Sequence, residues 1–402
     1  MSLIDWRNLY AANRAVIEGA VPAALPSGPL LVPPGGGASA APTRSTAAPL
    51  PLPSAASSRA WPALRLPDLP QAPIGPTPGG AGTWERLDDV AGAQGRSVFV
   101  YTPPGLSSEA PAPAVVMLHG CTQTAASFAA GALMNAAADR HGFVVVYPEQ
   151  SRDHNAQGCW NWFASGHQVR GGAEPSFIAG AARTLLDTAS AWTIDQRRVF
   201  VAGLSAGGAM AGVVAATHPD LFAAAAVHSG LAYGCAHGIP AAMSAMTRGG
   251  QDPEQQGRAA FAAMGSAARV VPVISIHGNA DATVCPVNGE HVVRQWMATN
   301  RLASAGDYEP ELSRPATMSR DSAAGGRSYT RRSWTDASGA LVQEHIEVEG
   351  MGHAWSGGAT GGSYTDPRGP SAAEMIWSFF ERVRPGAARP PRGPAGEPCT
   401  SR

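Results

Sequence analysis

Ser205 lies at the centre of a Gly-x-Ser-x-Gly pentapeptide, and the segments on both sides of it favour a nucleophilic role. The pentapeptide 203–207 follows the apolar run 198–202 and precedes the alanine-rich segment 208–216. This order of strand, turn and helix holds a serine hydroxyl above the end of the strand, in a turn so tight that it needs glycines. The helix directs its positive N-terminus at the place where negative charge develops in acyl transfer. The sequence therefore predicts a catalytic serine; the alternative is a glycine-rich turn with a capping serine.

A histidine and an aspartate follow later strands at positions that suit proton transfer from Ser205. A serine hydroxyl is a weak nucleophile unless a base removes its proton. His353 follows the predicted strand 344–348, and Asp281 follows the predicted strand 272–276. Because the carboxyl ends of parallel strands share one rim of a sheet, His353 is the expected base and Asp281 the expected orienting acid. The chain order Ser, Asp, His is typical of α/β-hydrolases.

Several nearby residues stay open as alternatives. His119, His228 and His277 also end predicted strands, and Asp220 follows the helix after Ser205 as a weaker candidate acid. An aspartate in a loop is often a turn or cap residue, which is the alternative for Asp281. A loop histidine held by its neighbours is the alternative for His353.

An acyl-transfer site also needs two amides that bind the developing oxyanion. The amide of Ala206, directly after the serine, is the first expected donor, and the loop after strand 114–118 should supply the second. In that loop we favour the Cys121 amide, with Thr122 as the alternative. In this role the thiol of Cys121 is dispensable for the chemical step.

The five cysteines show no metal-binding pattern. None lies in a Cys-x-x-Cys pair, and no Cys/His spacing indicates zinc, so we expect neither a metal nor a cofactor. Cys235 and Cys285 follow strand ends on the same rim, and they could form a disulfide if their Cα atoms lie within about 7 Å. The cysteines, which are Cys121, Cys159, Cys235, Cys285 and Cys399, do not fix the redox compartment.

The elements that position these residues alternate between apolar strands and alanine-rich helices. Nearly continuous Val, Ile and Ala runs are typical of strands covered on both faces, which predicts a mostly parallel sheet with helices on each side. The fold class is therefore α/β. The expected strands are 83–87, 97–101, 114–118, 143–147, 198–202, 223–227, 272–276 and 344–348, and the expected helices are 125–140, 176–188, 206–216, 290–300 and 371–384.

Composition divides the chain into three parts. Residues 1–82 combine a possible short amphipathic helix over 1–20 with a Pro, Ala, Gly and Ser-rich segment that cannot bury enough surface to fold. Residues 83–385 form the expected catalytic domain, and 386–402 a disordered tail. With a net charge of −1 and 15% charged residues, nucleic-acid binding is not expected. No apolar run reaches the roughly 20 residues of a membrane span.

Together these motifs resemble those of the esterase, polyhydroxybutyrate (PHB) depolymerase family of α/β-hydrolases. The similarity covers about residues 97–384. It implies serine esterase chemistry on uncharged esters, with Ser205, Asp281 and His353 as the triad and with Cys121 and Ala206 at the oxyanion positions. The segments that carry the resemblance are 118–123 (LHGCTQ), 158–163 (GCWNWF), 203–210 (GLSAGGAM), 277–284 (HGNADATV) and 352–358 (GHAWSGG).

The resemblance implies a polyester or small ester as the substrate, and the aromatic residues suit a neutral, partly apolar one. Trp160, Trp162 and Trp355 lie in loops on the predicted rim and are candidates for binding an apolar ester chain; alternatively, they fill a small core of the loops themselves. The expected substrate is poly(3-hydroxybutyrate) or short-chain hydroxyalkanoate oligomers. The alternatives are a feruloyl or acetylxylan esterase, and a non-catalytic polymer- or granule-binding protein.

Location and surface contacts are further expectations. The resemblance implies an extracellular enzyme, whereas residues 1–20 show no secretory signal peptide, which keeps a cytoplasmic role open. The apolar side of that segment, with Leu3, Trp6 and Tyr10, could contact a granule or another surface. An inert leader is the alternative.

Overall fold

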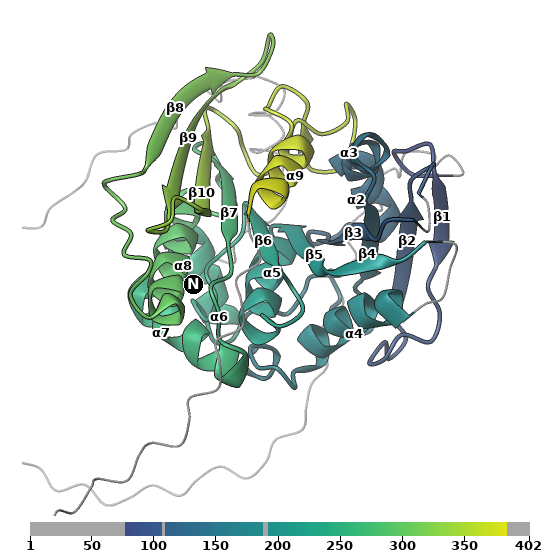
Figure 1. Ribbon diagram of the computed structural model, residues 1–402, viewed down its shortest axis with the longest axis horizontal. Coiled ribbons are helices and arrows are strands. Elements are labelled where there is room, and N and C mark those ends of the chain that lie inside the picture. Colours follow the sequence, from purple (N-terminus) through teal and green to yellow (C-terminus); the bar gives the residue numbers. More distant parts are fainter. Residues whose placement is uncertain (1–76, 107–108, 188–191, 384–402) are drawn as a thin grey trace, which may run out of the picture. The chain divides into compact units, whose positions relative to one another are not determined.

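The computed structural model describes residues 77–106, 109–187 and 192–383, which contain one large sheet between two layers of helices (Figure 1). The ten strands of this sheet follow the order β1-β2-β4-β3-β5-β6-β7-β10-β9-β8. The six strands from β4 to β10 pair in parallel, and antiparallel strands extend the sheet at both ends. The strands are β1 (Thr83–Arg86), β2 (Ser97–Thr102), β3 (Ala112–Leu118), β4 (Val144–Glu149), β5 (Ile194–Leu204), β6 (Ala224–His228), β7 (Val273–Gly278), β8 (Thr317–Ser322), β9 (Ser328–Thr335) and β10 (Leu341–Val348).

Helices cover both faces of the sheet, as Figure 1 shows, which confirms the predicted α/β fold. In the buried strand β3, Val116 packs into the core on one face and Val115 into the core on the other. Among the described residues, no helix is long and apolar enough to cross a membrane. One face carries α2 (Ala125–Ala132), α3 (Met134–His141) and α9 (Ala372–Arg382), and the other carries α4 (Ala173–Asp187), α5 (Ala206–Thr217), α6 (Ile239–Arg248), α7 (Pro253–Met264) and α8 (Val287–Ser304).

Every strand expected from the sequence is present, but the chain also contains elements that the sequence analysis missed. Helices α6 and α7 were not predicted, although Asp252 caps α7 and Pro253 occupies its first turn. Strands β8 and β9 were also missed. All six residues of β8 are exposed, so this strand carries no apolar run from which it could be recognised.

The expected helix 125–140 is divided into α2 and α3 at Leu133, which has a left-handed backbone with φ of 58°. The carbonyls of Gly131 and Ala132 are bonded outside the helix: they accept hydrogen bonds from the Ala359 amide at 2.8 Å and the Trp355 indole at 3.0 Å. The break therefore provides acceptors for the loop that follows His353.

The described chain begins a few residues before the expected domain boundary. The carbonyl of Pro78 accepts a hydrogen bond from the buried Asn135 side chain at 2.6 Å. The amides of Ala81 and Gly82 bond to Asp139 and Tyr101, at 2.9 and 2.8 Å. Residues 78–82 therefore pack against the folded domain. The proposed helix over 1–20 and the segments predicted to be disordered, apart from residues 77–82, lie outside the described residues.

Candidate active site

Ser205 occupies a sharp turn between β5 and α5. Its backbone has φ of 59° and ψ of −119°, a strained conformation for a residue with a side chain. A Cβ on Gly203 would lie 2.3 Å from the Gly207 carbonyl oxygen, and a Cβ on Gly207 would lie 2.1 Å from the Leu118 carbonyl oxygen. Both glycines are therefore required by close backbone contacts, as the sequence predicted.

His353 and Asp281 lie beside Ser205 in a continuous chain of hydrogen bonds. Nε2 of His353 is 2.8 Å from the Ser205 hydroxyl, and its Nδ1 is 2.7 Å from Oδ2 of Asp281. Oδ1 of Asp281 accepts the amides of Thr283 and Val284, at 2.9 and 2.8 Å. The structure thus brings together all three residues expected from the sequence, and the backbone fixes the carboxylate against the imidazole.

The surroundings of Asp281 keep its carboxylate charged. Burial alone would raise the pKa of Asp281, but the electrostatic interaction with His353 and hydrogen bonds from His277 and His353 hold this pKa well below its usual range. An ionised carboxylate accepts the Nδ1 proton of His353, which leaves Nε2 available to accept the proton of Ser205.

The two expected oxyanion amides lie at the ends of neighbouring elements. Ala206 is the first residue of α5, where a backbone amide has no partner within the helix. The Thr122 amide donates to the Gln157 carbonyl at 2.7 Å and is therefore occupied. In contrast, the Cys121 amide makes no hydrogen bond to another described residue. This arrangement favours Cys121 over Thr122.

Cys121 is also joined by a disulfide to Cys159, a pairing that the sequence did not indicate. The bond ties the loop after β3 to the segment that contains Gln157, whose carbonyl holds the Thr122 amide. The suggested Cys235–Cys285 disulfide is wrong, since both thiols are free. Burial raises the pKa of Cys235 to about 12, so this thiol forms little of the reactive thiolate.

The competing polar residues have other roles. His119 and His228 are buried, which lowers the pKa of His119 to about 4 and that of His228 well below its usual value. Each accepts a backbone amide through Nε2, from Gln150 or Ser356 respectively.

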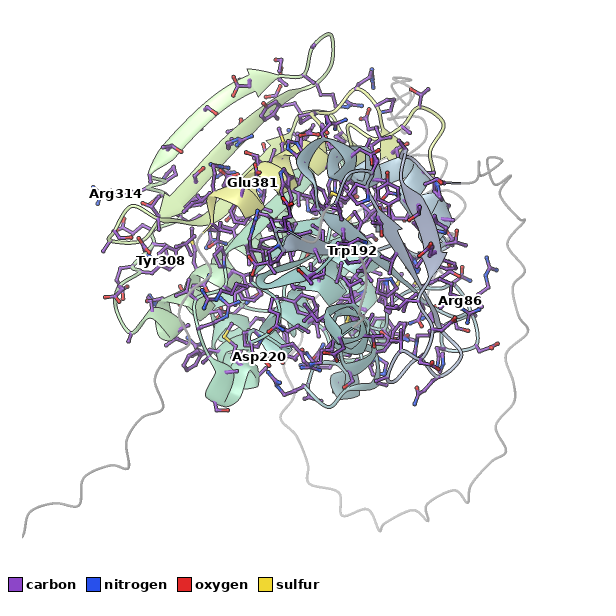
Figure 2. All side chains as sticks on the ribbon, turned by 45° about the vertical axis from the view of Figure 1, so that its right-hand side comes forward. Arg86, Trp192, Asp220, Tyr308, Arg314 and Glu381 are labelled. Carbon is purple, nitrogen blue, oxygen red and sulfur yellow. A yellow bond between two sulfur atoms is a disulfide. The ribbon has the colours of Figure 1, made fainter. Side chains whose placement is uncertain are left out.

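The remaining two alternatives are also placed clearly. His277 contacts the loop that holds Asp281. Its Nε2 donates to the Val284 carbonyl at 2.9 Å and lies 3.4 Å from Oδ2 of Asp281. Asp220 follows α5 at the end opposite to Ser205 and forms a surface ion pair with Arg170. Figure 2 labels Asp220 in the lower part of the molecule. Asp220 is therefore remote from His353 and does not orient it.

The three tryptophans expected to bind substrate are instead buried. Trp160 and Trp355 have no exposed surface, and Trp162 is 5% exposed. Trp355 stacks on His228 and donates to the Ala132 carbonyl, so its ring faces the protein interior. The expectation of substrate contact is therefore corrected: these rings stabilise the loops by apolar burial, which was the alternative explanation.

Tyr364 is the aromatic residue near the triad that the sequence analysis missed. Its half-buried ring meets the His353 ring edge-on at a centroid distance of 6.5 Å, and its hydroxyl lies 3.4 Å from the hydroxyl of Thr122. The Ser363 carbonyl next to it accepts the Gln123 side chain at 2.9 Å. The segment therefore packs between the histidine and the predicted oxyanion loop. An aromatic residue in a Gly/Ser-rich loop was the available signal.

Breaking the disulfide is expected to weaken both the fold and the predicted oxyanion loop. In Cys159→Ser, loss of a cross-link between residues 38 apart should lower the free energy of unfolding by roughly 3–4 kcal/mol. Since a misplaced oxyanion donor costs at most about 10²–10³ in kcat, the expected loss of turnover is between about threefold and a hundredfold. Thermal unfolding and kcat on a soluble ester measure the two effects. Cys285→Ser, which removes a free thiol, is the matched control and should leave both unchanged.

Within residues 77–106, 109–187 and 192–383, no cluster of three or more His, Cys, Asp or Glu side chains could hold a metal ion. What the site offers is a hydroxyl, a base with its orienting carboxylate, and two amides. These groups suit nucleophilic acyl transfer.

Two known proteins are similar to this chain in sequence. The chain is 36% identical over 259 residues to Poly(3-hydroxyalkanoate) depolymerase C of Paucimonas lemoignei, a match that covers 64% of this chain and 58% of that protein. It is 31% identical over 226 residues to Acetylxylan esterase A of Aspergillus oryzae, covering 54% of this chain and 71% of the relative.

A solved structure supports the fold independently. The acetyl xylan esterase from Aspergillus awamori has a TM-score of 0.59 at 23% identity, covering 75% of this chain and all of its own. The family model described as Esterase PHB depolymerase matches residues 96–310, more than half of the 402 residues. The chain therefore belongs to the esterase, PHB depolymerase family.

Proposed function

We propose that this protein is a serine esterase that hydrolyses carboxylic esters through an acyl-enzyme. The observation that carries the proposal is the continuous hydrogen-bonded chain from Ser205 through His353 to Asp281, with the serine on a strained turn at the start of α5. A structural serine has no need of a buried, oriented imidazole at its hydroxyl. The same chain argues against a non-catalytic polymer-binding protein.

Each residue then has a defined step. The Ser205 oxygen attacks the ester carbonyl carbon while Nε2 of His353 takes the hydroxyl proton. The amides of Cys121 and Ala206 stabilise the negative oxygen that forms. His353 returns the proton to the departing alkoxide, which leaves as an alcohol, and Ser205 keeps the acyl group. His353 then takes a proton from a water molecule, which attacks the acyl carbon. As the bond to Ser205 breaks and the acid leaves, His353 returns this proton to the Ser205 oxygen.

The substrate we favour is poly(3-hydroxybutyrate) or short-chain hydroxyalkanoate oligomers. The match to the Paucimonas lemoignei depolymerase, at 36% identity, supports this choice. Acetylated polysaccharide is the second candidate, supported by the 31% identity to Acetylxylan esterase A. The half-buried Tyr364 beside His353 provides an aromatic surface suited to a neutral ester.

One comparison of substrates tests the proposal. Hydrolysis of p-nitrophenyl butyrate tests for esterase activity, and its absence would contradict the proposed function. Initial rates on polyester film, hydroxybutyrate oligomers, acetylated xylan and methyl ferulate then separate the substrates. Among these four substrates, we expect the highest kcat/KM on the hydroxybutyrate oligomers. A higher value on acetylated xylan would assign the second candidate.

Deleting residues 1–76 is expected to leave the domain folded and active on soluble esters. We also propose that residues 1–20, which lie outside the described residues, contact a polymer surface; in that case the same deletion lowers the rate on suspended polymer but not on p-nitrophenyl butyrate. The loss should be partial, because a short apolar segment binds surfaces only modestly. Rates on both substrates and the melting temperature check this prediction.

A longer deletion is the control for the boundary. Removing residues 1–82 also takes away the hydrogen bonds that residues 78–82 make with Asn135, Asp139 and Tyr101. Its melting temperature should therefore fall below that of the shorter deletion. Equal rates of the full-length and 1–76-deleted proteins on suspended polymer would contradict the surface contact.

An extracellular location is part of the proposal. The Cys121–Cys159 disulfide supports it, because disulfides persist in oxidising compartments and are rare in reducing ones.

A further inference from the structure

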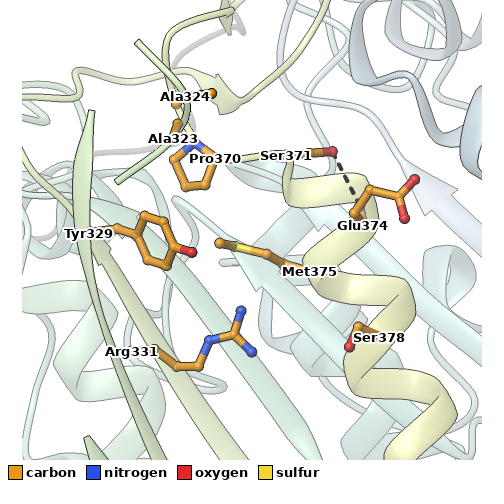
Figure 3. A pocket seen from close by; sticks show the side chains of 10 residues that line it. Ala323, Ala324, Tyr329, Arg331, Pro370, Ser371, Glu374, Met375 and Ser378 are labelled. Atoms are coloured by element: carbon orange, nitrogen blue, oxygen red, sulfur yellow. Dashed lines mark hydrogen bonds between the residues drawn. The ribbon is translucent and has the colours of Figure 1, made fainter. Parts of the chain in front are cut away.

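A cavity that opens to the surface lies between β9 and α9. It has a volume of about 430 Å³, within the size range of small-molecule sites. Figure 3 shows Tyr329 and Arg331 extending from β9 toward Met375 on α9. Because Tyr329 and Arg331 are two residues apart on one strand, their side chains share a face of the sheet. None of the residues that line this cavity belongs to the triad or to the predicted oxyanion pair.

The cavity contains the cation Arg331, whose side chain forms an ion pair with the buried Glu344 carboxylate but no hydrogen bond with the described residues. The guanidinium of Arg331 is 3.7 Å from Oε2 of Glu344, too far for a hydrogen bond, and Oε2 itself accepts none. The other oxygen of Glu344 is bonded by Arg382 at 2.7 Å. Two guanidinium groups therefore face one carboxylate, which leaves an excess of positive charge beside the cavity.

Glu374, the carboxylate in the cavity lining, does not cancel this charge. Glu374 is bonded to Arg140 and to His141 across α3, so its charge is already compensated. Tyr329 also lines the cavity, and its hydroxyl is a further donor. An arginine fork beside a phenol is a suitable pair of donors for a carboxylate.

The rest of the lining is mixed, with the side chains of Ser371 and Ser378 beside apolar ones. Met375, Pro370 and the alanines of the β8–β9 turn provide a surface for a short hydrocarbon body. The same wall continues into the segment that carries His353: the Pro370 carbonyl accepts the Ser356 hydroxyl at 2.7 Å. The cavity thus combines the Arg331 cation, the Tyr329 hydroxyl and apolar side chains, with the Glu374 carboxylate also in its lining.

We propose that this cavity binds a small monocarboxylate with an apolar body, with Arg331 and Tyr329 holding the carboxylate and Met375 contacting the chain. Acids of this class are released when esters are hydrolysed. The proposed function is needed only to explain where the ligand comes from, and the binding itself does not depend on it. For a ligand of this size the dissociation constant should be on the order of 1 mM.

Calorimetric titration of the full-length protein with butyrate and hexanoate tests the site. We expect Arg331→Gln to weaken binding at least tenfold and Tyr329→Phe to weaken it a few-fold, with hexanoate bound more tightly than butyrate. Arg320→Gln removes the same charge from the exposed neighbouring strand and should bind as the wild type does. Butyramide, which has the shape but no charge, should not bind.

The controls separate this site from the esterase site. Ser205→Ala should bind the acids as the wild type does, and Arg331→Gln should hydrolyse p-nitrophenyl butyrate at the wild-type rate. The acid-binding site and the esterase activity can therefore each be tested even if the other proposal fails. If Arg331→Gln does not fold, Arg331→Lys is the second variant, because it keeps a positive charge near Glu344. It should still weaken binding, because lysine lacks the planar fork of arginine. No heat of binding in the wild type, or equal binding by the Arg331 variants, would overturn the proposal.

Discussion

Ser205→Ala is expected to lower kcat by about 10⁴- to 10⁶-fold on any ester that the protein hydrolyses, because the variant has no nucleophile. The residual rate above background should come from the oxyanion amides and from binding alone. The folded state should be retained, since the amide of Ser205, which donates to the His228 carbonyl at 2.9 Å, belongs to the backbone. Initial rates with p-nitrophenyl butyrate measure the loss, and circular dichroism checks the fold.

The matched control is Ser229→Ala, which removes a buried hydroxyl from the next strand end without touching His353. Its kcat should stay within about tenfold of the wild type, because it loses only one neutral hydrogen bond, to His228. If Ser205→Ala kept more than a tenth of the wild-type rate, the assignment of the nucleophile would be wrong.

Asp281→Asn should lower kcat by about 10⁴-fold, as the loss of the orienting carboxylate does in the serine protease template, with little change in KM. Asparagine can still accept the amides of Thr283 and Val284 through its oxygen, so the turn should persist. Its amide group, however, presents a donor to Nδ1 of His353 and favours the wrong tautomer. Steady-state kinetics with a soluble ester separates the kcat effect from the KM effect.

Asp220→Asn makes the same chemical change at a surface ion pair and serves as the control. Its turnover should match the wild type within about twofold, since exposed pairs contribute little. A severe loss in Asp220→Asn together with a mild loss in Asp281→Asn would instead assign the orienting acid to Asp220.

The sequence was sufficient for the parts of the site that depend on local backbone geometry. Ser205 could be found because its turn needs Gly203 and Gly207, and because an apolar strand precedes it. Asp281 and His353 could be found because both follow strands that the apolar pattern predicts. The parallel core of the sheet was also predictable, because strands that are buried on both faces consist of nearly continuous apolar residues.

The parts that depend on packing between distant segments could not be read from the sequence. Cys121 and Cys159 come together only through the fold, and their spacing gave no signal. Trp355 looked like a surface residue of the rim, but its indole donates to the break between α2 and α3, which the sequence did not predict. Tyr364 lies beside His353 because its loop is bonded to a distant segment. The carbonyl of the preceding residue, Ser363, accepts a hydrogen bond from Gln123, which lies 240 residues earlier in the chain.

The outermost strand of the sheet has a consequence for the behaviour of the protein at high concentration. Strand β8 pairs within the described sheet only with β9, so its other edge offers a row of backbone donors and acceptors to a second strand. Its side chains are exposed on both faces, including Met318 at 68%. Arg320 and Asp321 place opposite charges on this edge, which disfavours stacking of flat, uncharged strands. Replacing these two residues by valine would create an apolar, β-branched edge, and the protein would then form visible aggregates at concentrations where the natural sequence stays dispersed.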